Sequence, residues 1–377
     1  MANPLTGTQS MLRTMNGRAI LEALARRGPL TRSDLMQATG LSRTAVTQVL
    51  RMLEGRGGIV TAGVDRATQG PAATRVSLNP RLGYAAAVHI DHHDAHVALV
   101  DATGAVRAEA HAPLTPSYDR VDVVSALIEE CTGGVAPVHS AVVGVPGIVT
   151  RDGAIRDDHG PDGGGFRTAL AERIGCPVRV ENDVNLAALA ELSGPLGTEN
   201  SSFTLLMLDG GLGAASVLDG VLHRGTGGIA GEVQYLPQTP LPLGAPVVGD
   251  AVTADLALEA GRDPGLSLLA HLEAAADGDA VALSIVTEIA RRITVIAGTV
   301  TLVIDPGAFV LGGLAAHPVM IETIRAEAEA WADQLPLRFD ASAFGREAPL
   351  VGAVHEAAAE LRSIVFTRVL SPDSRKS

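Results

Sequence analysis

The segment 31–53, TRSDLMQATGLSRTAVTQVLRML, limits most strongly what this chain can fold into. It predicts two short helices joined by a tight turn, with Thr31 capping the first helix and Gly40 ending it. Ser42 is positioned to cap the second helix. One face of that helix is apolar at helical spacing, and its residues are Ala45, Val46, Val49, Leu50 and Leu53.

The opposite face of the second helix carries side chains that reach base edges and phosphates from the major groove. We therefore interpret the pair as a helix-turn-helix and 42–53 as its recognition helix. The alternative is an amphipathic helical hairpin whose polar face is only solvated. The candidate DNA-contacting residues are Ser42, Arg43, Thr44, Thr47, Gln48 and Arg51.

The flanking segments complete the outline of a winged helix-turn-helix domain over residues 1–80. Residues 16–27 predict a first helix that stops at Gly28-Pro29. The short β-like runs 59–60 and 75–78 flank a turn rich in small residues. Arg66 and Arg75 in this wing are candidates to contact DNA phosphates, or they are solvated loop charges.

The charge is distributed unevenly along the chain. Residues 1–80 hold ten arginines and four acidic residues, a balance of +6, so a net charge of −13 leaves −19 for the remainder. A basic domain is thus attached to an acidic body, and attraction to DNA phosphates acts locally through the basic part.

The composition excludes several classes of protein. No apolar run approaches the roughly 18 residues of a membrane-spanning helix, and the N-terminal segment does not resemble a signal peptide. Cys131 and Cys176 are the only cysteines, too few for a disulfide framework or a four-cysteine zinc site. We expect a soluble, cytoplasmic protein without membrane partners.

Beyond residue 80, strands alternate with helices, which predicts an α/β body. We expect strands at 85–90, 95–101, 105–111, within 138–149, at 177–180, at 203–208 and within 300–313. We expect helices at 119–130, 184–192, 280–299, 318–333 and 351–368.

Several motifs of this body resemble the ROK family of repressors, open reading frames and kinases, in its transcription-regulator branch. They are VVGVPGIV (142–149), VENDVNLAALAE (180–191), LDGGLGAASVLDGVLHRGTGGIAGE (208–232) and DPGAFVLGG (305–313). The resemblance implies an actin-like (ribonuclease H-like) sugar-kinase fold of two α/β lobes with a cleft between them. It also implies a homodimer or homotetramer. The expected lobes are 81–197, joined by the C-terminal helix 351–377, and 198–350.

The phosphate-binding loops depart from the pattern of the family's kinases. Where the first loop of the kinases reads Asp-x-Gly-Gly-Thr, this chain has His89-Ile90-Asp91-His92-His93. The second loop places Asp209 where the kinases have a glycine. An acidic side chain there repels phosphate. We therefore expect no ATP cofactor and no kinase activity, with Asp183 the vestige of a catalytic base.

The sugar-binding side of the pattern is better preserved. The resemblance assigns ligand contacts to Gly147, Asn182, Asp183 and Glu232. Asp183 either accepts a hydrogen bond from a ligand hydroxyl or caps the helix that starts near 184.

The family's zinc segment, Gly-Glu-x-Gly-His followed by cysteines, is replaced by GEVQYLPQTPLPLGAP, which lacks cysteine. In this alignment Gln234 is the counterpart of the histidine. No metal is expected there. HIDHHDAH (89–96) is an alternative set of metal ligands if it forms a strand, although a turn with solvated Asp and His is the simpler interpretation.

The sequence thus predicts a regulator, acting as a repressor of carbohydrate-related genes, that binds double-stranded operator DNA. A sugar or sugar phosphate is the expected effector. The alternatives are an effector-independent regulator and an active ATP-dependent sugar kinase with a DNA-binding head.

Overall fold

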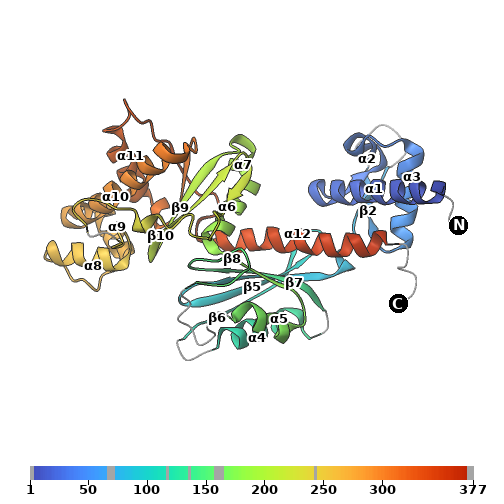
Figure 1. Ribbon diagram of the computed structural model, residues 1–377, viewed down its shortest axis with the longest axis horizontal. Helices are drawn as coiled ribbons and strands as arrows, with labels where there is room; N and C mark the ends of the chain where they lie inside the picture. Colours follow the sequence, from blue (N-terminus) through green and yellow to red (C-terminus); the bar gives the residue numbers. More distant parts are fainter. Residues whose placement is uncertain are drawn as a thin grey trace. The chain divides into compact units, whose positions relative to one another are not determined.

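A computed structural model describes residues 4–65, 73–115, 119–134, 137–156, 165–241 and 244–371 (Figure 1). The chain forms two compact units. The first comprises Met1–Val143, Phe166–Arg179 and Val354–Ser377, and the second comprises Gly144–Gly165 and Val180–Ala353. None of the helices within these described ranges is long and apolar enough to cross a membrane.

The N-terminal part of the first unit is a winged helix-turn-helix domain. Its elements are α1 (Pro4–Arg27), β1 (Leu30–Thr31), α2 (Arg32–Thr39), α3 (Arg43–Gly55), β2 (Ile59–Asp65) and β3 (Ala73–Leu78). Thr31 caps α2 in a reciprocal capping box with Asp34, and Gly40 ends α2 at a φ of 69°. Ser42 caps α3. The predicted caps are therefore confirmed.

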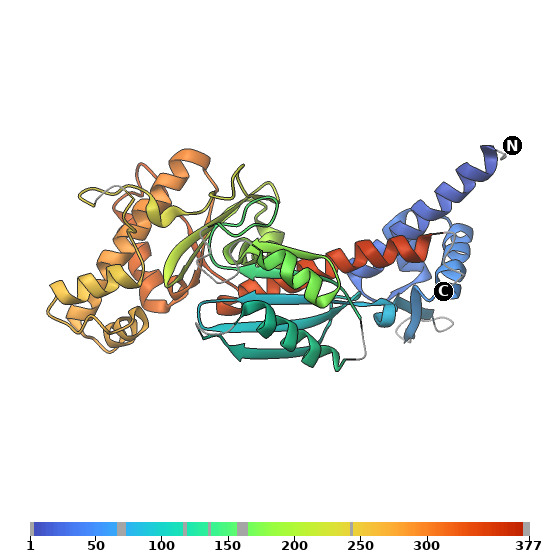
Figure 2. The ribbon, with the colours of Figure 1, turned by 60° about the horizontal axis from the view of Figure 1, so that its bottom comes forward.

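A five-stranded sheet of order β6-β5-β4-β7-β8 forms the rest of the first unit. Its strands are β4 (Tyr84–Ile90), β5 (Asp94–Asp101), β6 (Val106–Pro113), β7 (Val138–Val145) and β8 (Val178–Asn182), and the last residues of β7 and β8 belong to the second unit. The helices α4 (Arg120–Thr132) and α5 (Phe166–Ile174) cover one face, and α12 (Ala348–Leu370) runs along the other (Figure 1, Figure 2). The turn η1 (Pro80–Leu82) joins the winged domain to β4.

The second unit contains another five-stranded sheet, of order β11-β10-β9-β12-β13. Its strands are β9 (Phe203–Asp209), β10 (Gly211–Leu218), β11 (Val221–His223), β12 (Phe309–Gly313) and β13 (Phe339–Ala341). Alternate residues of β9 pack into two different hydrophobic cores, one on each face of the sheet. Leu205 and Met207 pack on the side of α6 (Asp183–Ser193), whereas Leu206 and Leu208 pack on the side of α10 (Ala280–Ile304) and α11 (Pro318–Glu329). The remaining helices are α7 (Pro195–Glu199), α8 (Asp250–Glu259) and α9 (Leu268–Ala276), with the short turns η2 (Val233–Tyr235), η3 (Leu314–Ala316) and η4 (Gly345–Glu347).

The two sheets have the same topology. In each, three antiparallel strands in sequence order are followed, on the side of the first strand, by a fourth and a fifth strand. Such a repeated unit is what the actin-like fold requires, so the predicted fold class is confirmed. The predicted division into three domains remains a prediction. Residues 180–197, expected in the first lobe, fall in the second compact unit.

Two predicted elements were placed wrongly. Helix α1 begins at Pro4, well before residue 16. The strand predicted within 300–313 starts only at Phe309, because Val300–Ile304 continue α10 as its last turn until Asp305 ends it in a left-handed conformation. A β-branched run does not distinguish the end of a helix from a strand.

Candidate functional site

The outer face of α3 presents the predicted DNA-contacting side chains. Ser42, Arg43, Thr44, Gln48 and Arg51 are exposed and Thr47 is half-buried, whereas Val46, Val49, Leu50 and Leu53 are buried against the domain. The Thr47 hydroxyl donates to the Arg43 carbonyl oxygen at 2.8 Å, as helical threonines commonly do. This leaves the hydroxyl oxygen available as an acceptor.

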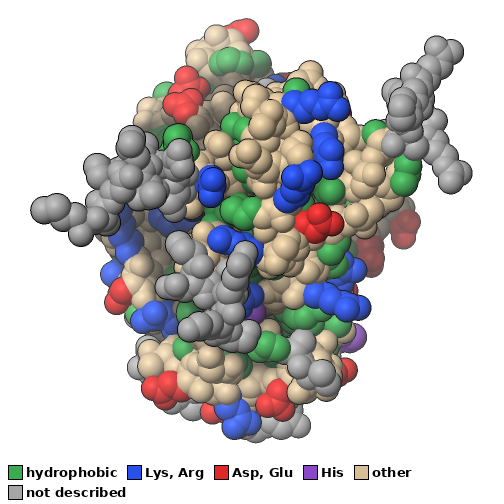
Figure 3. Space-filling view, turned by 90° about the vertical axis from the view of Figure 1, so that its right-hand side faces the viewer, with side chains coloured by type: hydrophobic (Ala, Val, Ile, Leu, Met, Phe, Trp, Pro, Cys, Tyr) green, Lys and Arg blue, Asp and Glu red, His purple; other side chains and the backbone are tan. Residues whose placement is uncertain are grey.

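Arginine side chains extend the basic surface of the winged domain beyond α3. In the upper half of Figure 3 several of them are spread over one face with few acidic side chains between them. Arg75, on β3 of the wing, is exposed and lies opposite Thr31 in the sheet. Arg66 lies outside the described residues.

Two of the four predicted ligand residues, Asn182 and Gly147, are linked by a hydrogen bond. The Asn182 side chain accepts a hydrogen bond from the Asn185 N–H at 2.9 Å and donates one to the Gly147 carbonyl oxygen at 3.0 Å. Gly147 has a φ of 95°, which only glycine adopts readily. Asn182 therefore caps α6, and the alternative that Asp183 is the cap is wrong, because Asp183 is the first helical residue.

Asp183 and Glu232 are two carboxyl groups whose pKa values are raised by burial. Burial raises the pKa of Asp183 to about 7, against the hydrogen bond from the Val184 N–H, and the negative charges of Asp209 and Glu232 add to the rise. Burial also raises the pKa of Glu232. Within the described part of the chain, the Glu232 side chain has no hydrogen-bond partner. Two half-buried carboxyl groups are thus available to a polar ligand.

A buried carboxylate that the sequence did not single out supports this pair. Glu181 accepts hydrogen bonds from the Asn182 N–H at 3.2 Å and the Asn185 side-chain amide at 2.9 Å. Its other oxygen pairs with Arg224 at 2.7 Å. Glu181 therefore connects the start of α6 to the segment that leads to Glu232. The ENDVN motif contained this residue, but its partner lies 43 positions away and spacing gave no sign of it.

The segment after Glu232 requires a correction to our alignment with the family. Counted from Gly231, the histidine of Gly-Glu-x-Gly-His corresponds to Tyr235, not to Gln234. Tyr235 is about half exposed at 47%. The Gln234 side chain instead lies over the β9–β10 hairpin, with its oxygen 2.7 Å from where a Gly211 side chain would start.

The glycines of the β9–β10 region have packing roles. A methyl group on Gly213 would lie 2.7 Å from Val184 in α6, and one on Gly231 would lie 2.0 Å from the Ala214 carbonyl oxygen. These close approaches hold α6 and the Glu232 segment against the sheet. Close packing therefore accounts for these glycines without a bound nucleotide.

The β4–β5 turn satisfies backbone N–H groups of its own with a side chain. The Asp91 carboxylate accepts hydrogen bonds from the N–H groups of His93 and Asp94, both at 2.7 Å. Burial opposes ionisation, but these bonds and the nearby His89 and His93 hold the pKa of Asp91 below its usual value. The Asp91 carboxylate thus occupies two backbone donors of its own turn.

The histidines around this turn do not continue one strand, because residues 91–93 form the turn itself. His89 lies opposite His96 in the sheet, and the rings of His96 and His111 stack with centroids 5.5 Å apart. Among the residues that the structure describes, no three His, Cys, Asp or Glu side chains are grouped so that they could hold a metal ion.

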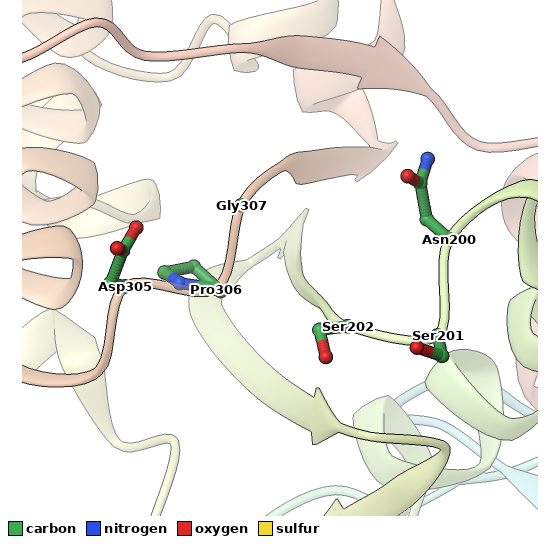
Figure 4. A pocket seen from close by; sticks show the side chains of 6 residues that line it. All are labelled: Asn200, Ser201, Ser202, Asp305, Pro306 and Gly307. Atoms are coloured by element: carbon green, nitrogen blue, oxygen red, sulfur yellow. The ribbon is translucent and has the colours of Figure 1, made fainter.

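A surface pocket lies away from these residues. It is lined by Asn200, Ser201 and Ser202 before β9 and by Asp305, Pro306 and Gly307 before β12 (Figure 4). Asp209 and Gly313 end the same two parallel strands at their opposite ends. Sites of α/β folds form at the carboxyl ends of the strands, so this pocket is not the candidate site.

Comparisons with known proteins place the chain in a family. The ROK family model matches residues 85–359, and a model of winged helix-turn-helix DNA-binding domains matches residues 16–59. The transcriptional dual regulator NagC of Escherichia coli is 25% identical over 245 residues, which cover 62% of this chain and 60% of NagC. The Bacillus subtilis xylose repressor is 19% identical over 242 residues, covering 60% of this chain and 62% of the repressor. The chain thus matches less than two thirds of the length of these relatives.

Solved structures agree on the fold. A ROK family transcriptional regulator, a homologue of the E. coli MLC protein, superposes with a TM-score of 0.72 at 20% identity, covering 95% of this chain and 99% of that one. A ROK family glucokinase from Streptomyces griseus, in complex with glucose and AMPPNP, gives a TM-score of 0.61 at 24% identity and covers 74% of this chain and all of that one. At these identities the likeness concerns the fold alone.

Proposed function

This chain belongs to the ROK family, and on that premise we propose that it is a transcription regulator, a repressor whose affinity for operator DNA is modulated by a sugar or sugar-derived effector. One observation carries the proposal. The same chain joins a recognition helix with an exposed polar face to a site with two half-buried carboxyl groups, Asp183 and Glu232, whose pKa values burial raises.

The DNA-binding half of the proposal rests on α3. Its buried apolar face fixes the helix to the winged domain, while Arg43 and Gln48 project side chains that pair with guanine and adenine edges. The basic surface around it supplies attraction to phosphates. The repressors among the relatives, for N-acetylglucosamine and for xylose, agree with a repressor role.

The effector half rests on Asp183 and Glu232. Carboxyl groups with spare acceptor positions suit the hydroxyl groups of a sugar, and a ligand that leaves them unpaired is penalised. The Asn182 amide keeps one hydrogen beyond its bond to the Gly147 carbonyl oxygen, so Asn182 and the adjoining Gly147 remain candidate contacts. N-Acetylglucosamine and xylose appear in the names of related repressors, so they are the first effectors to test.

The competing function is an ATP-dependent sugar kinase, since glucokinases share the fold. Two observations weigh against it. Asp91 occupies the backbone donors of the first phosphate loop, and Asp209 adds a negative charge beside Asp183. A phosphoryl group with its own negative charge is disfavoured there.

Thermal unfolding of the purified protein tests the proposal against a panel of glucose, N-acetylglucosamine, xylose, their phosphates, and ATP with Mg²⁺. A ligand that binds only the folded state raises the midpoint, with about 2.7 kcal/mol gained at a concentration of 100 Kd. We expect a shift with one sugar or sugar phosphate and none with ATP. The same shift should vanish in Glu232→Ala.

The other outcomes select other functions. A shift with ATP, together with turnover that Asp183→Asn abolishes, would establish the kinase. No shift with any compound, in a protein that binds operator DNA, would establish an effector-independent regulator.

A further inference from the structure

We propose that helix α12 couples the candidate ligand site to the winged domain, so that a displacement of α6 is transmitted to the DNA-binding elements. The inference rests on the proposed function and adds its means of regulation. Helix α12 is one continuous helix that starts in the second unit and continues into the first (Figure 1).

The first turns of α12 pack directly against α6, the helix that carries the ligand site at its start. Gly352 approaches the α6 backbone so closely that a methyl group there would lie 1.9 Å from the Leu186 carbonyl oxygen. Ala348 belongs to the same buried cluster as Val184 and Ala187 of α6. Interiors packed this closely transmit small displacements instead of absorbing them.

The middle of α12 is fixed by charged side chains. Arg179, near the start of β8, pairs with Glu356 at 2.6 Å and with Glu360, one turn later, at 2.5 Å. Arg362 donates to the carbonyl oxygens of Ala102 and Thr103 in the β5–β6 turn, at 2.9 and 3.1 Å. These bonds hold the helix to the first sheet over two turns.

The last turn of α12 is bound to the winged domain and to the segment that leads out of it. Arg56, the residue that ends α3, donates to the Val369 carbonyl oxygen at 2.8 Å, and Arg368 donates to that of Leu82 at 2.5 Å. A methyl group on Gly58 would lie 2.8 Å from the Val369 side chain. The recognition helix therefore ends on the same helix that begins against α6.

A helix is suited to this role because its backbone hydrogen bonds make it stiff along its axis. Helix α12 has 23 residues, so it spans roughly 34 Å at 1.5 Å per residue. An effector that prefers one position of α6 would then also favour one position of α3, which is the differential affinity that coupling requires.

Hydrogen exchange of the full-length protein, without DNA or effector, tests the coupling. In Gly352→Ala we expect the amides of Gly58 and Asn79 in the winged domain to exchange at least about threefold faster than in the unmodified protein. The matched control is Gly298→Ala, whose methyl group would lie 2.8 Å from Trp331 in the second unit without touching α12. Unchanged exchange in Gly352→Ala, or the same change in both variants, would overturn the proposal.

A second pair of variants tests the reverse direction and does not depend on the folding of Gly352→Ala. Arg56→Ala should speed exchange in the first turn of α6, where the Asn185 N–H is bonded to Asn182. Arg18→Ala, which removes only a surface ion pair with Glu22, should not. Equal behaviour of these two variants would refute the coupling. If the variants show the expected changes in exchange but the protein binds no DNA, the coupling through α12 is supported and the proposed function is refuted.

Discussion

At the residue scale, the geometry of the candidate site depends most on the Glu181 carboxylate. It receives hydrogen bonds from two residues of the α6 start and an ion pair from Arg224, and only 8% of its side chain is exposed. A buried charge needs such partners, because desolvation without them costs several kcal/mol.

Removal of the Arg224 partner is therefore expected to destabilise the protein. Arg224→Ala should lower the free energy of unfolding by about 2 kcal/mol, less than for a fully buried pair because Arg224 is 41% exposed. Arg338→Ala, from the more exposed pair with Asp340, should cost under about 1 kcal/mol. Urea unfolding measures both, and equal losses would show that Glu181 does not depend on Arg224.

The raised pKa of Asp183 predicts a pH-dependent stability. The folded protein holds this proton up to about pH 7, whereas the unfolded chain releases it near pH 3.8, so its stabilisation is present at low pH and is lost as the pH rises through 7. Asp183→Asn should accordingly be more stable than the unmodified protein at pH 8, by roughly 2–4 kcal/mol, and the gain should shrink towards pH 5. Urea midpoints across this range measure the difference, and a gain independent of pH would refute the raised pKa.

The recognition side chains make a further prediction at this scale. Arg43→Ala or Gln48→Ala should reduce discrimination between operator and scrambled DNA by about 1–3 kcal/mol, through loss of base contacts. Arg18→Ala on α1 should affect both duplexes equally. Fluorescence anisotropy at fixed salt gives the two affinities, and similar losses on both duplexes for Arg43→Ala would mean that α3 does not read bases.

At the element scale, the turn between α2 and α3 sets the position of the recognition helix. Gly40 has a φ of 69° with open space around it, whereas Gly55, also in open space, has ordinary helical geometry. Gly40→Ala should cost about 1 kcal/mol of stability, and Gly55→Ala should be neutral or gain about 0.5 kcal/mol. Thermal unfolding distinguishes them. Equal effects would mean that the backbone angle at Gly40 does not limit the turn.

Within the winged domain, the limits of α2 and the start of α3 were predictable because their signals are local, whereas the start of α1 was not. Thr31, Gly40 and Ser42 mark helix ends by their own chemistry, and the period of the apolar residues identifies the buried face of α3. The end of α10 was not predictable in this way, since Val300–Ile304 is compatible with a strand until tertiary packing decides.

The candidate site was predictable only in part. The motifs gave Asn182, Asp183 and Glu232, but not the bond from Asn182 to Gly147 or the pair of Glu181 with Arg224. Those partners are 35 and 43 residues apart, and no periodic pattern connects residues across such distances. The contacts of these residues with DNA and with a ligand remain predictions.

At the scale of the whole molecule, the charge is divided unevenly between two parts of the chain. A winged domain with a balance of +6 precedes a body that carries −19, so attraction to DNA is confined to the N-terminal part. The body repeats one sheet topology twice and carries the candidate ligand site within its second unit.

The central claim is that a sugar-derived ligand changes DNA binding, and one titration tests it most directly. An operator selected from a random duplex library is titrated with the full-length protein in the absence and presence of the compound that raises the unfolding midpoint. We predict that the compound weakens operator affinity by about five- to 150-fold, the usual range of allosteric coupling, and leaves the affinity of Glu232→Ala unchanged. An operator affinity that is the same with and without a bound compound would contradict the account.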